Sequence, residues 1–326
     1  MGLITPEMEP LRISGYIDRA AEDFLRQWQS DSCYIEAHTS GSTGAPKRIM
    51  LAKSDMLKSA ENTVRFFGLN SDSLLLLPLS VSYIAGKMMI VRAIVSGAEL
   101  LTVKPSNNPM EGLTIDQDIS LMAIVPSQIE AVLPYADRIR RLIIGGAPMT
   151  PQQELAVTAS GIEAYATYGM TETCSHVALR RIGESCFHAL DGVTFSCDSR
   201  GCLVINAPEF TYKSLVTNDI VELVDCRTFR WLGRYDNVIN SGGIKLFPEI
   251  IEAEITPLLC DRRFYITSRK SGKWGEEAVL MVEGEEIAGL AERIASVLDP
   301  VRRPKAIVYQ ERFDMTSSGK IKRNKL

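Results

Sequence analysis

Four hydroxyl side chains, two glycines and one lysine fall within the segment from His38 to Lys47. Glycines let backbone N–H groups turn toward a ligand, and successive N–H groups form an anion-binding concavity. The hydroxyls add donors and the lysine adds a compact positive charge. We therefore predict a polyphosphate-binding loop formed by Thr39, Ser40, Gly41, Ser42, Thr43, Gly44 and Lys47. The spacing differs from the Walker GxxxxGK[ST] pattern. A flexible Ser/Gly linker is the alternative, although a linker has no use for the Pro46–Lys47 ending.

The segment Tyr168-Gly169-Met170-Thr171-Glu172 places an aromatic ring, a hydroxyl and a carboxylate close together. An aromatic ring can stack on a base, and a carboxylate can hold Mg²⁺, which prefers oxygen ligands and substrate phosphates. An ordinary strand-to-helix turn with a solvated Glu172 is the alternative interpretation. The segment is thus a candidate for nucleotide and metal binding.

Three more segments carry charge where a ligand could use it. Asp219 ends a loop and could accept hydrogen bonds from ribose hydroxyls, although an Asx turn is the simpler interpretation. Arg234 and Asp236 flank Tyr235 and could equally form a surface ion pair. Lys320 follows a Ser/Gly stretch in a basic C-terminus, which a solvated tail would also explain.

Expected strands and helices alternate along the chain and would determine where these segments lie. We expect strands over residues 34–37, 74–77, 99–103, 122–125, 141–144 and 163–167, and helices over 15–30, 54–67, 87–96, 127–133 and 150–159. Ser54 is the expected N-cap of its helix. This alternation predicts an α/β fold with largely parallel strands, in which ligand-binding loops gather at the carboxyl ends of the strands.

After Gly183 the pattern changes to short β-like runs over residues 194–196, 202–205, 220–224 and 229–232, typical of an antiparallel unit. Beyond Asp236 we expect helices over 248–259 and 286–298 and strands over 278–282 and 306–309. We therefore predict a large N-terminal domain of layered sheets and helices over 1–235. A small α+β C-terminal domain over 236–326 would carry Lys320.

Composition limits the classes of protein and partner. A net charge of −4 gives no reason to expect nucleic acid as a partner. The seven cysteines form no CxxC pair and suit a reducing compartment, so we expect a cytoplasmic protein with no cysteine-bound metal. The first residues lack the features of a secretion signal, and the longest uncharged run is too short to span a membrane. The oligomeric state, a homodimer included, stays open.

Taken together and in this order, the segments resemble the adenylate-forming superfamily of acyl- and aryl-CoA synthetases, adenylation domains and luciferases. The resemblance runs from about residue 34 to the C-terminus. It rests on the hydroxyl-rich loop, Gly145-Gly146-Ala147-Pro148, the Tyr168–Glu172 segment, Asp219, Gly233 to Asp236 with Ile239 to Gly243, and Gly319-Lys320. Within the superfamily, Val125 to Ile129, Tyr168 to Ser175, Leu77 to Gly86, and Ser241 to Glu249 are similar to o-succinylbenzoate–CoA ligases of menaquinone biosynthesis.

The resemblance implies an acid–thiol ligase that joins a carboxylate to coenzyme A with ATP and Mg²⁺, through an acyl-adenylate. It assigns the β- and γ-phosphates to Thr39–Gly44 with Lys47, Mg²⁺ to Glu172, and the α-phosphate to Thr171. It assigns adenine to Gly145, Gly146, Ala147 and Tyr168, the ribose to Asp219 and Arg234, and catalysis to Lys320 with Thr171 and Glu172. Gly169 also belongs to the ATP-binding residues. It places Tyr83, Gly86, Ser127, Gln128, Gly242 and Gly243 beside the acyl group or coenzyme A, and the hinge at Asp236.

The chain also departs from the family pattern. The hydroxyl-rich loop begins at His38, which implies that the family's first subdomain is largely missing and that the large domain is shortened at its start. Tyr83 stands where relatives often have histidine, and Asn218 replaces a glycine. Three activities therefore stay open: another acyl- or aryl-CoA synthetase, an enzyme that loads a carrier protein, and a silent nucleotide-binding relative.

Overall fold

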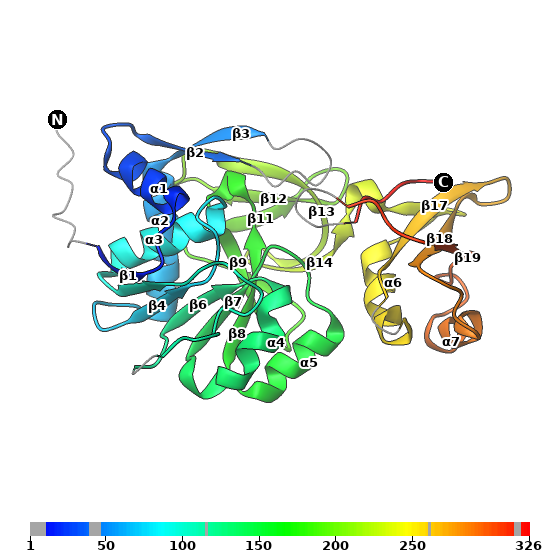
Figure 1. Ribbon diagram of the computed structural model, residues 1–326. Helices are drawn as coiled ribbons and strands as arrows, with labels where there is room; N and C mark the ends of the chain where they lie inside the picture. Colours follow the sequence, from blue (N-terminus) through cyan, green and yellow to red (C-terminus); the bar gives the residue numbers. More distant parts are fainter. Residues whose placement is uncertain (1–10, 39–46, 115–116, 260–261, 316–320) are drawn as a thin grey trace.

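The structure is a computed structural model and describes residues 11–38, 47–114, 117–259, 262–315 and 321–326. In these ranges the chain forms a 12-stranded sheet, a 5-stranded sheet and a 2-stranded hairpin, with helices packed on the sheets (Figure 1). The predicted α/β class is confirmed. No helix in the described ranges is long and apolar enough to cross a membrane.

The first half of the large sheet is parallel, as the alternating pattern predicts. Its strands lie in the order β1 (Arg12–Gly15), β5 (Glu99–Thr102), β4 (Leu74–Leu77), β6 (Leu121–Ile124), β7 (Arg141–Ile144) and β8 (Glu163–Gly169). Helices connect them: α1 (Arg19–Gln29), α2 (Lys53–Phe67), α3 (Ile84–Ser96), α4 (Ile129–Val132) and α5 (Pro151–Ser160).

The side chains of β4 show how helices come to cover both faces of this sheet. Leu75 and Leu77 pack in one core with Met56 of α2 and Met89 of α3. Leu74 and Leu76 point the other way and share a second core with α4 and α5. A strand buried on both faces reads as a continuous apolar run, and this is why four consecutive leucines form a strand here.

The antiparallel strands extend the same sheet instead of forming a separate one. Their order is β9 (His176–Arg181), β10 (Phe187–Ala189), β14 (Thr228–Arg234), β13 (Lys213–Asp225), β12 (Cys202–Ala207) and β11 (Thr194–Cys197). The join is between β8 and β9, which pair antiparallel from Tyr165 to Gly169. The last parallel strand therefore lies directly beside the antiparallel half.

The small sheet collects the strands that follow Val238. It contains β15 (Ile239–Ser241), β16 (Ile244–Leu246), β17 (Phe264–Ser271), β18 (Gly275–Glu283) and β19 (Ala306–Gln310). Two helices, α6 (Pro248–Ile255) and α7 (Leu290–Val297), share a core with this sheet. The hairpin pairs β2 (Tyr34–His38) with β3 (Arg48–Ala52), and the hydroxyl-rich segment connects these two strands.

Two sequence-based details were wrong. α2 begins at Lys53, and its N-cap is Ala52, whose side chain makes no cap hydrogen bond, so Ser54 lies inside the first turn. The last helix, expected from residue 286, begins at Leu290 because Gly289 precedes it with φ of 66°. That left-handed conformation cannot belong to a right-handed helix.

Candidate active site

The loops that follow β6, β7 and β8 meet at one edge of the parallel half. These three strands are neighbours and parallel, so their carboxyl ends lie side by side. The backbone N–H of Gly145, just after β7, donates to the carbonyl of Ile124 at the end of β6 over 3.1 Å. The edge where ligand loops were expected therefore holds the segments beginning at Val125, Gly145 and Tyr168.

Gly145 lies very close to its neighbour on β8. A Cβ at this position would lie 2.3 Å from the hydroxyl oxygen of Thr167, far inside van der Waals contact. The next residues, Gly146 and Ala147, are exposed. Their backbone groups are therefore accessible from solvent, as the proposed role toward adenine requires.

The segment after β8 turns sharply and leaves one carboxylate in solvent. Thr171–Thr173 form a short 3-10 helix. The buried Thr173 hydroxyl donates to the Ser175 carbonyl over 2.7 Å and accepts from the Met170 N–H over 2.9 Å. Thr171 is half-buried and Glu172 is exposed. The hydrogen bonds of Thr173 therefore stabilise the turn, and the carboxylate of Glu172 stays available for a ligand.

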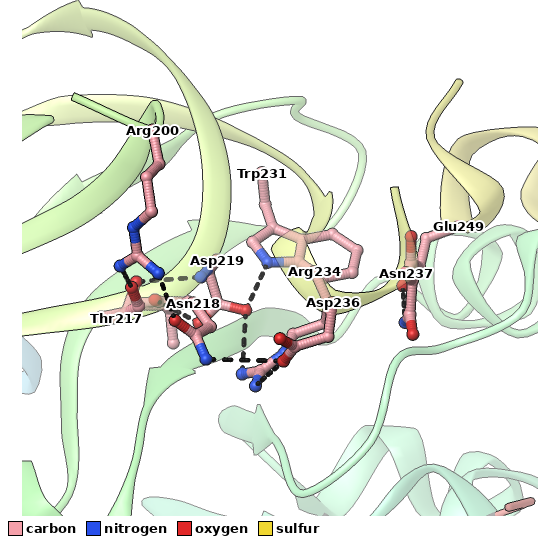
Figure 2. A network of polar contacts seen from close by, with 10 residues as sticks. Arg200, Thr217, Asn218, Asp219, Trp231, Arg234, Asp236, Asn237 and Glu249 are labelled. Carbon is pink, nitrogen blue, oxygen red and sulfur yellow. Dashed lines mark hydrogen bonds and ion pairs between the residues drawn. The ribbon is translucent and has the colours of Figure 1, made fainter. Parts of the chain in front are cut away.

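Tyr168 and Asp219 connect the two halves of the large sheet. The Tyr168 hydroxyl donates to Oδ2 of Asp219 over 2.8 Å. Asp219 is 7% exposed, and its Oδ1 accepts from Trp231 Nε1 over 3.2 Å and from Arg234 Nη1 over 3.5 Å (Figure 2). Burial, followed by the Asp219 charge, raises the pKa of Tyr168 well above 10. The phenol thus remains a donor at physiological pH.

Arg234 extends this network to the residue predicted as the hinge. Its Nη2 donates to Oδ2 of Asp236 over 3.4 Å, and Asn218 Nδ2 donates to the same oxygen at the same distance. Arg200 in turn donates to Asn218 Oδ1 over 3.0 Å (Figure 2). Its guanidinium also lies over the Tyr235 ring. Asn218, which replaces a glycine of the family pattern, therefore has hydrogen bonds to both Arg200 and Asp236.

Sequence reasoning missed Arg200 and Trp231. Trp231 reaches Asp219 because β13 and β14 pair antiparallel, with Asp219 opposite Arg234 and a bulge between Ile220 and Val221. The predicted short β runs could have suggested this hairpin, but not the bulge. Arg200 is far from Asn218 along the chain, and no local pattern signals that contact.

The residues assigned to the acyl and coenzyme A side belong to three segments of the chain. Tyr83 precedes α3 and is exposed, while Gly86 is buried in the first turn of α3. Ser127 is exposed. Gln128 is buried, and its amide accepts from Val125 N–H over 3.1 Å and donates to the Ser106 carbonyl over 2.7 Å. Gln128 therefore supports the loop after β6. Gly242 and Gly243 form the turn between β15 and β16.

Arg92 of α3 is a buried cation that contacts Ser175, and sequence reasoning missed it. It is 2% exposed. Nη2 donates to the Ser175 hydroxyl over 2.6 Å and Nη1 lies 3.5 Å from the Met89 sulfur, while Nε has no partner. In the described part of the chain no carboxylate pairs with it. Burial lowers the pKa of Arg92 to about 9.

His176 next to this arginine is buried and neutral. Its Nε2 lies 3.1 Å from the Thr63 hydroxyl and its Nδ1 lies 3.4 Å from the Ser175 hydroxyl. Burial, followed by the charge of Arg92, lowers its pKa well below 6.5. His176 therefore packs in the core between α2 and β9, and its ring is uncharged at neutral pH.

Several predicted positions lie outside the described residues: Thr39, Ser40, Gly41, Ser42, Thr43, Gly44 and Lys320. Lys47 is described, is exposed, and directly precedes β3. Over the described ranges, no three His, Cys, Asp or Glu side chains gather as a metal site.

Comparison with known proteins settles the family. Residues 7–200 match the family described as AMP-binding enzyme. The chain belongs to this family. It is an adenylate-forming ligase of the acyl-CoA synthetase class, and the predicted superfamily is confirmed.

Two relatives of this AMP-binding enzyme are 2-succinylbenzoate–CoA ligases. The protein from Listeria innocua is 26% identical over 98% of this chain and 74% of its own length. The protein from Enterococcus faecalis is 23% identical over 93% of this chain and 71% of its own length.

Solved structures agree with the fold. The acyl-CoA synthetase (AMP-forming)/AMP-acid ligase II-like protein of Dyadobacter fermentans is 33% identical, with a TM-score of 0.63 over 93% of this chain and 91% of that chain. The O-succinylbenzoate coenzyme A synthetase of Bacillus subtilis, solved with ATP and a magnesium ion, has a TM-score of 0.76. It covers 88% of this chain and 68% of that chain at 18% identity, which supports the fold alone.

Proposed function

We propose that this AMP-binding enzyme is an o-succinylbenzoate–CoA ligase of menaquinone biosynthesis. In the first half-reaction the substrate carboxylate attacks the α-phosphorus of ATP, and pyrophosphate leaves. In the second, the thiol of coenzyme A attacks the acyl-adenylate carbonyl, and AMP leaves. The nucleophile of the first step is already ionised near neutral pH, so this step needs no general base.

The observation that carries the substrate assignment is the unpaired guanidinium of Arg92. Burying a charge without a partner is costly, and such charges are usually paired. Arg92 contacts Ser175, which follows directly on the turn that bears Thr171 and Glu172. o-Succinylbenzoate has two carboxylates. One would be adenylated, and the second would give Arg92 an anion that no residue in the described ranges supplies.

Electrostatic stabilisation explains the proposed roles around ATP. An anion that attacks a polyanion needs fixed positive groups and donors around the developing charge. We infer that Thr39–Gly44 with Lys47 bind the β- and γ-phosphates, that Thr171 contacts the α-phosphate, and that Lys320 bridges the α-phosphate and the reacting carboxylate. Asp219 and Arg234 would bind the ribose, and Gly145 to Ala147 with Tyr168 would contact adenine.

Glu172 fits a magnesium ion, because its carboxylate is exposed at the end of β8. Mg²⁺ usually takes one or two protein carboxylates together with substrate phosphates. When bound, the ion would neutralise phosphate charge. Glu172 itself would fix the ion beside the turn that presents Thr171.

In this proposal the second half-reaction requires a rotation of the C-terminal residues about a hinge just after β14. We infer that residues 236–326 turn about Asp236 as a mobile domain relative to residues 1–235. Asp236 is exposed and held by two 3.4 Å contacts, and hinges absorb backbone change at a few loop positions. Gly242 and Gly243, in an exposed turn just beyond it, would then approach the pantetheine arm.

Mixing the full chain with magnesium ATP, coenzyme A and o-succinylbenzoate tests the proposal, with AMP, pyrophosphate and thioester as readouts. Two analogues, each lacking one carboxylate, serve as controls and should react poorly. Arg92→Met should raise the KM for o-succinylbenzoate by roughly 10–100-fold, because charge-assisted hydrogen bonds contribute about 1.5–3 kcal/mol. The KM for ATP should hardly change.

Different failures of this assay mean different things. An unchanged KM for o-succinylbenzoate in Arg92→Met would reject the role proposed for Arg92. No turnover of o-succinylbenzoate while another acid reacts would reject this substrate and leave another acyl- or aryl-CoA synthetase. Transfer to a phosphopantetheinylated carrier protein but not to coenzyme A would identify a carrier-loading enzyme. Absence of pyrophosphate release with every acid would identify a silent nucleotide-binding relative.

A further inference from the structure

The last six residues of the chain lie along the edge of the small sheet. The Thr267 hydroxyl on β17 donates to the Asn324 carbonyl over 2.8 Å, and the Leu326 N–H donates to the Ser268 carbonyl over 3.0 Å. The Lys325 ammonium lies 3.3 Å from Glu276 of β18. The C-terminal segment is therefore bound to β17 and β18 by backbone and side-chain contacts.

A bidentate ion pair between Arg323 and Glu252 is the strongest of these contacts. Arg323 Nη1 and Nη2 each donate to one oxygen of Glu252 over 2.7 Å. Oε1 of Glu252 also accepts from the Ile266 N–H over 2.6 Å. One carboxylate thus joins α6, β17 and the C-terminal segment. Bidentate Arg–carboxylate pairs add geometric specificity as well as energy, so this pair fixes the register of the segment.

The chain is also held just before the same segment. Phe313 is buried, and its ring packs edge-to-face on Tyr265 of β17 with centroids 5.1 Å apart. The Lys322 N–H donates to the Asp314 carbonyl over 2.9 Å, and Met315 and Ile321 form an antiparallel bridge. Both described ends that flank residues 316–320 are therefore attached to the small sheet.

We propose that Glu252 and Arg323 are positioning residues for adenylation, which set where the Lys320 amine can reach. The inference rests on the role proposed above for Lys320. Lys320 precedes Arg323 by three positions, so fixing Arg323 limits the reach of its side chain. A displacement of about 1 Å at a reacting group can reduce a rate on the order of 10²-fold.

Measurement of the two half-reactions separates positioning from general support of the fold. Arg323→Lys keeps the charge but loses the two-pronged geometry, and Glu252→Gln keeps the shape but loses the charge. Each should lower o-succinylbenzoate-dependent pyrophosphate release about 10–100-fold. Thioester formation from added acyl-adenylate and the KM for ATP should stay within about twofold of the parent. Lys325→Ala, which removes one exposed ion pair in the same segment, is the matched control and should retain both half-reactions.

A double-mutant cycle with Lys320→Ala decides how the pair acts. If Arg323 acts through Lys320, adding Arg323→Lys to Lys320→Ala should cause no further loss of pyrophosphate release. An equal loss in both backgrounds, or an equal loss in both half-reactions, would overturn the proposal. If Lys320→Ala alone leaves adenylation intact, the role proposed for Lys320 fails instead. Urea unfolding of each variant checks that it is folded, and Arg323→Ala provides a larger change at the same position.

Discussion

The hydroxyl of Tyr168 donates a 2.8 Å hydrogen bond to the buried carboxylate of Asp219. Tyr168 lies on β8, at the end of the parallel strands, and Asp219 lies on β13 in the antiparallel half. The bond therefore connects the residue proposed to contact adenine with the residue proposed to contact the ribose. Their positions toward ATP depend on each other, although they are far apart in the sequence.

Tyr168→Phe should weaken ATP binding. The change leaves Oδ2 of Asp219 without the donor that now satisfies it, and an unsatisfied buried group costs about 1–3 kcal/mol. We expect the KM for ATP to rise about 10-fold, with little change in the KM for coenzyme A. Initial-rate kinetics measure both. Tyr165→Phe removes a bond of the same length, to Glu163 on the same strand, and should leave both KM values unchanged.

Lys320→Ala should separate the two half-reactions. Loss of a fixed positive group at the point of charge development costs on the order of 10²–10³ in rate. We expect that loss in pyrophosphate release, while thioester formation from added acyl-adenylate continues near the parent rate. A matching loss in both steps would contradict a two-pose mechanism in which Lys320 serves only adenylation.

Much of the fold could be predicted because the parallel strands are buried on both faces. Leu74–Leu77 and Arg141–Ile144 are short apolar runs followed by turns, and both are strands. β17 (Phe264–Ser271) was missed, because its second half carries Arg269 and Lys270 at the surface. It is a strand because its eight residues pair antiparallel with β18, which follows after a short turn, and this pairing does not depend on an apolar run.

Some residues of the candidate site could be predicted from the sequence, and others could not. Tyr168, Asp219 and Arg234 were named from short motifs, and the structure brings them together. Arg92 lies in a run predicted as apolar helix, and nothing local shows that its charge is buried. Its burial follows from the packing of α3 against α2 and its contact with Ser175. Long-range packing of this kind leaves no pattern in the local sequence.

His176 should make the protein sensitive to acid. Its pKa in the folded state is well below 6.5 because burial and Arg92 disfavour the charged ring. Below pH 6.5 the unfolded chain therefore binds a proton that the folded chain does not, and the free energy of unfolding falls. The slope from this group approaches about 1.4 kcal/mol per pH unit.

Urea unfolding between pH 5 and 7 tests this expectation. His176→Gln should remove most of that slope, whatever its effect on stability at pH 7. His188→Gln changes an exposed histidine and should leave the slope as in the parent. A slope that persists in His176→Gln would assign the acid sensitivity to other groups.

Gly233 and Glu249 should determine how α6 packs against the end of β14. A Cβ at Gly233 would lie 2.4 Å from Oε2 of Glu249, an oxygen that is buried without a partner. Asn237 Nδ2 donates a hydrogen bond to the other oxygen of the same carboxylate, Oε1, over 2.5 Å (Figure 2). The carboxylate therefore cannot turn away without losing that bond, and a larger residue at position 233 must displace it.

Gly233→Ala should therefore lower the free energy of unfolding more than an ordinary glycine substitution does. Gly161→Ala is a reference for alanine at a positive φ without a clash, about 1–2 kcal/mol, because nothing lies within 4 Å of the added Cβ. The clash with Glu249 should add about 1–3 kcal/mol. Adding Glu249→Ala to Gly233→Ala should recover most of that extra loss in urea unfolding. Equal losses in the two glycine variants would show instead that α6 adjusts freely, and that the contact does not hold it against β14.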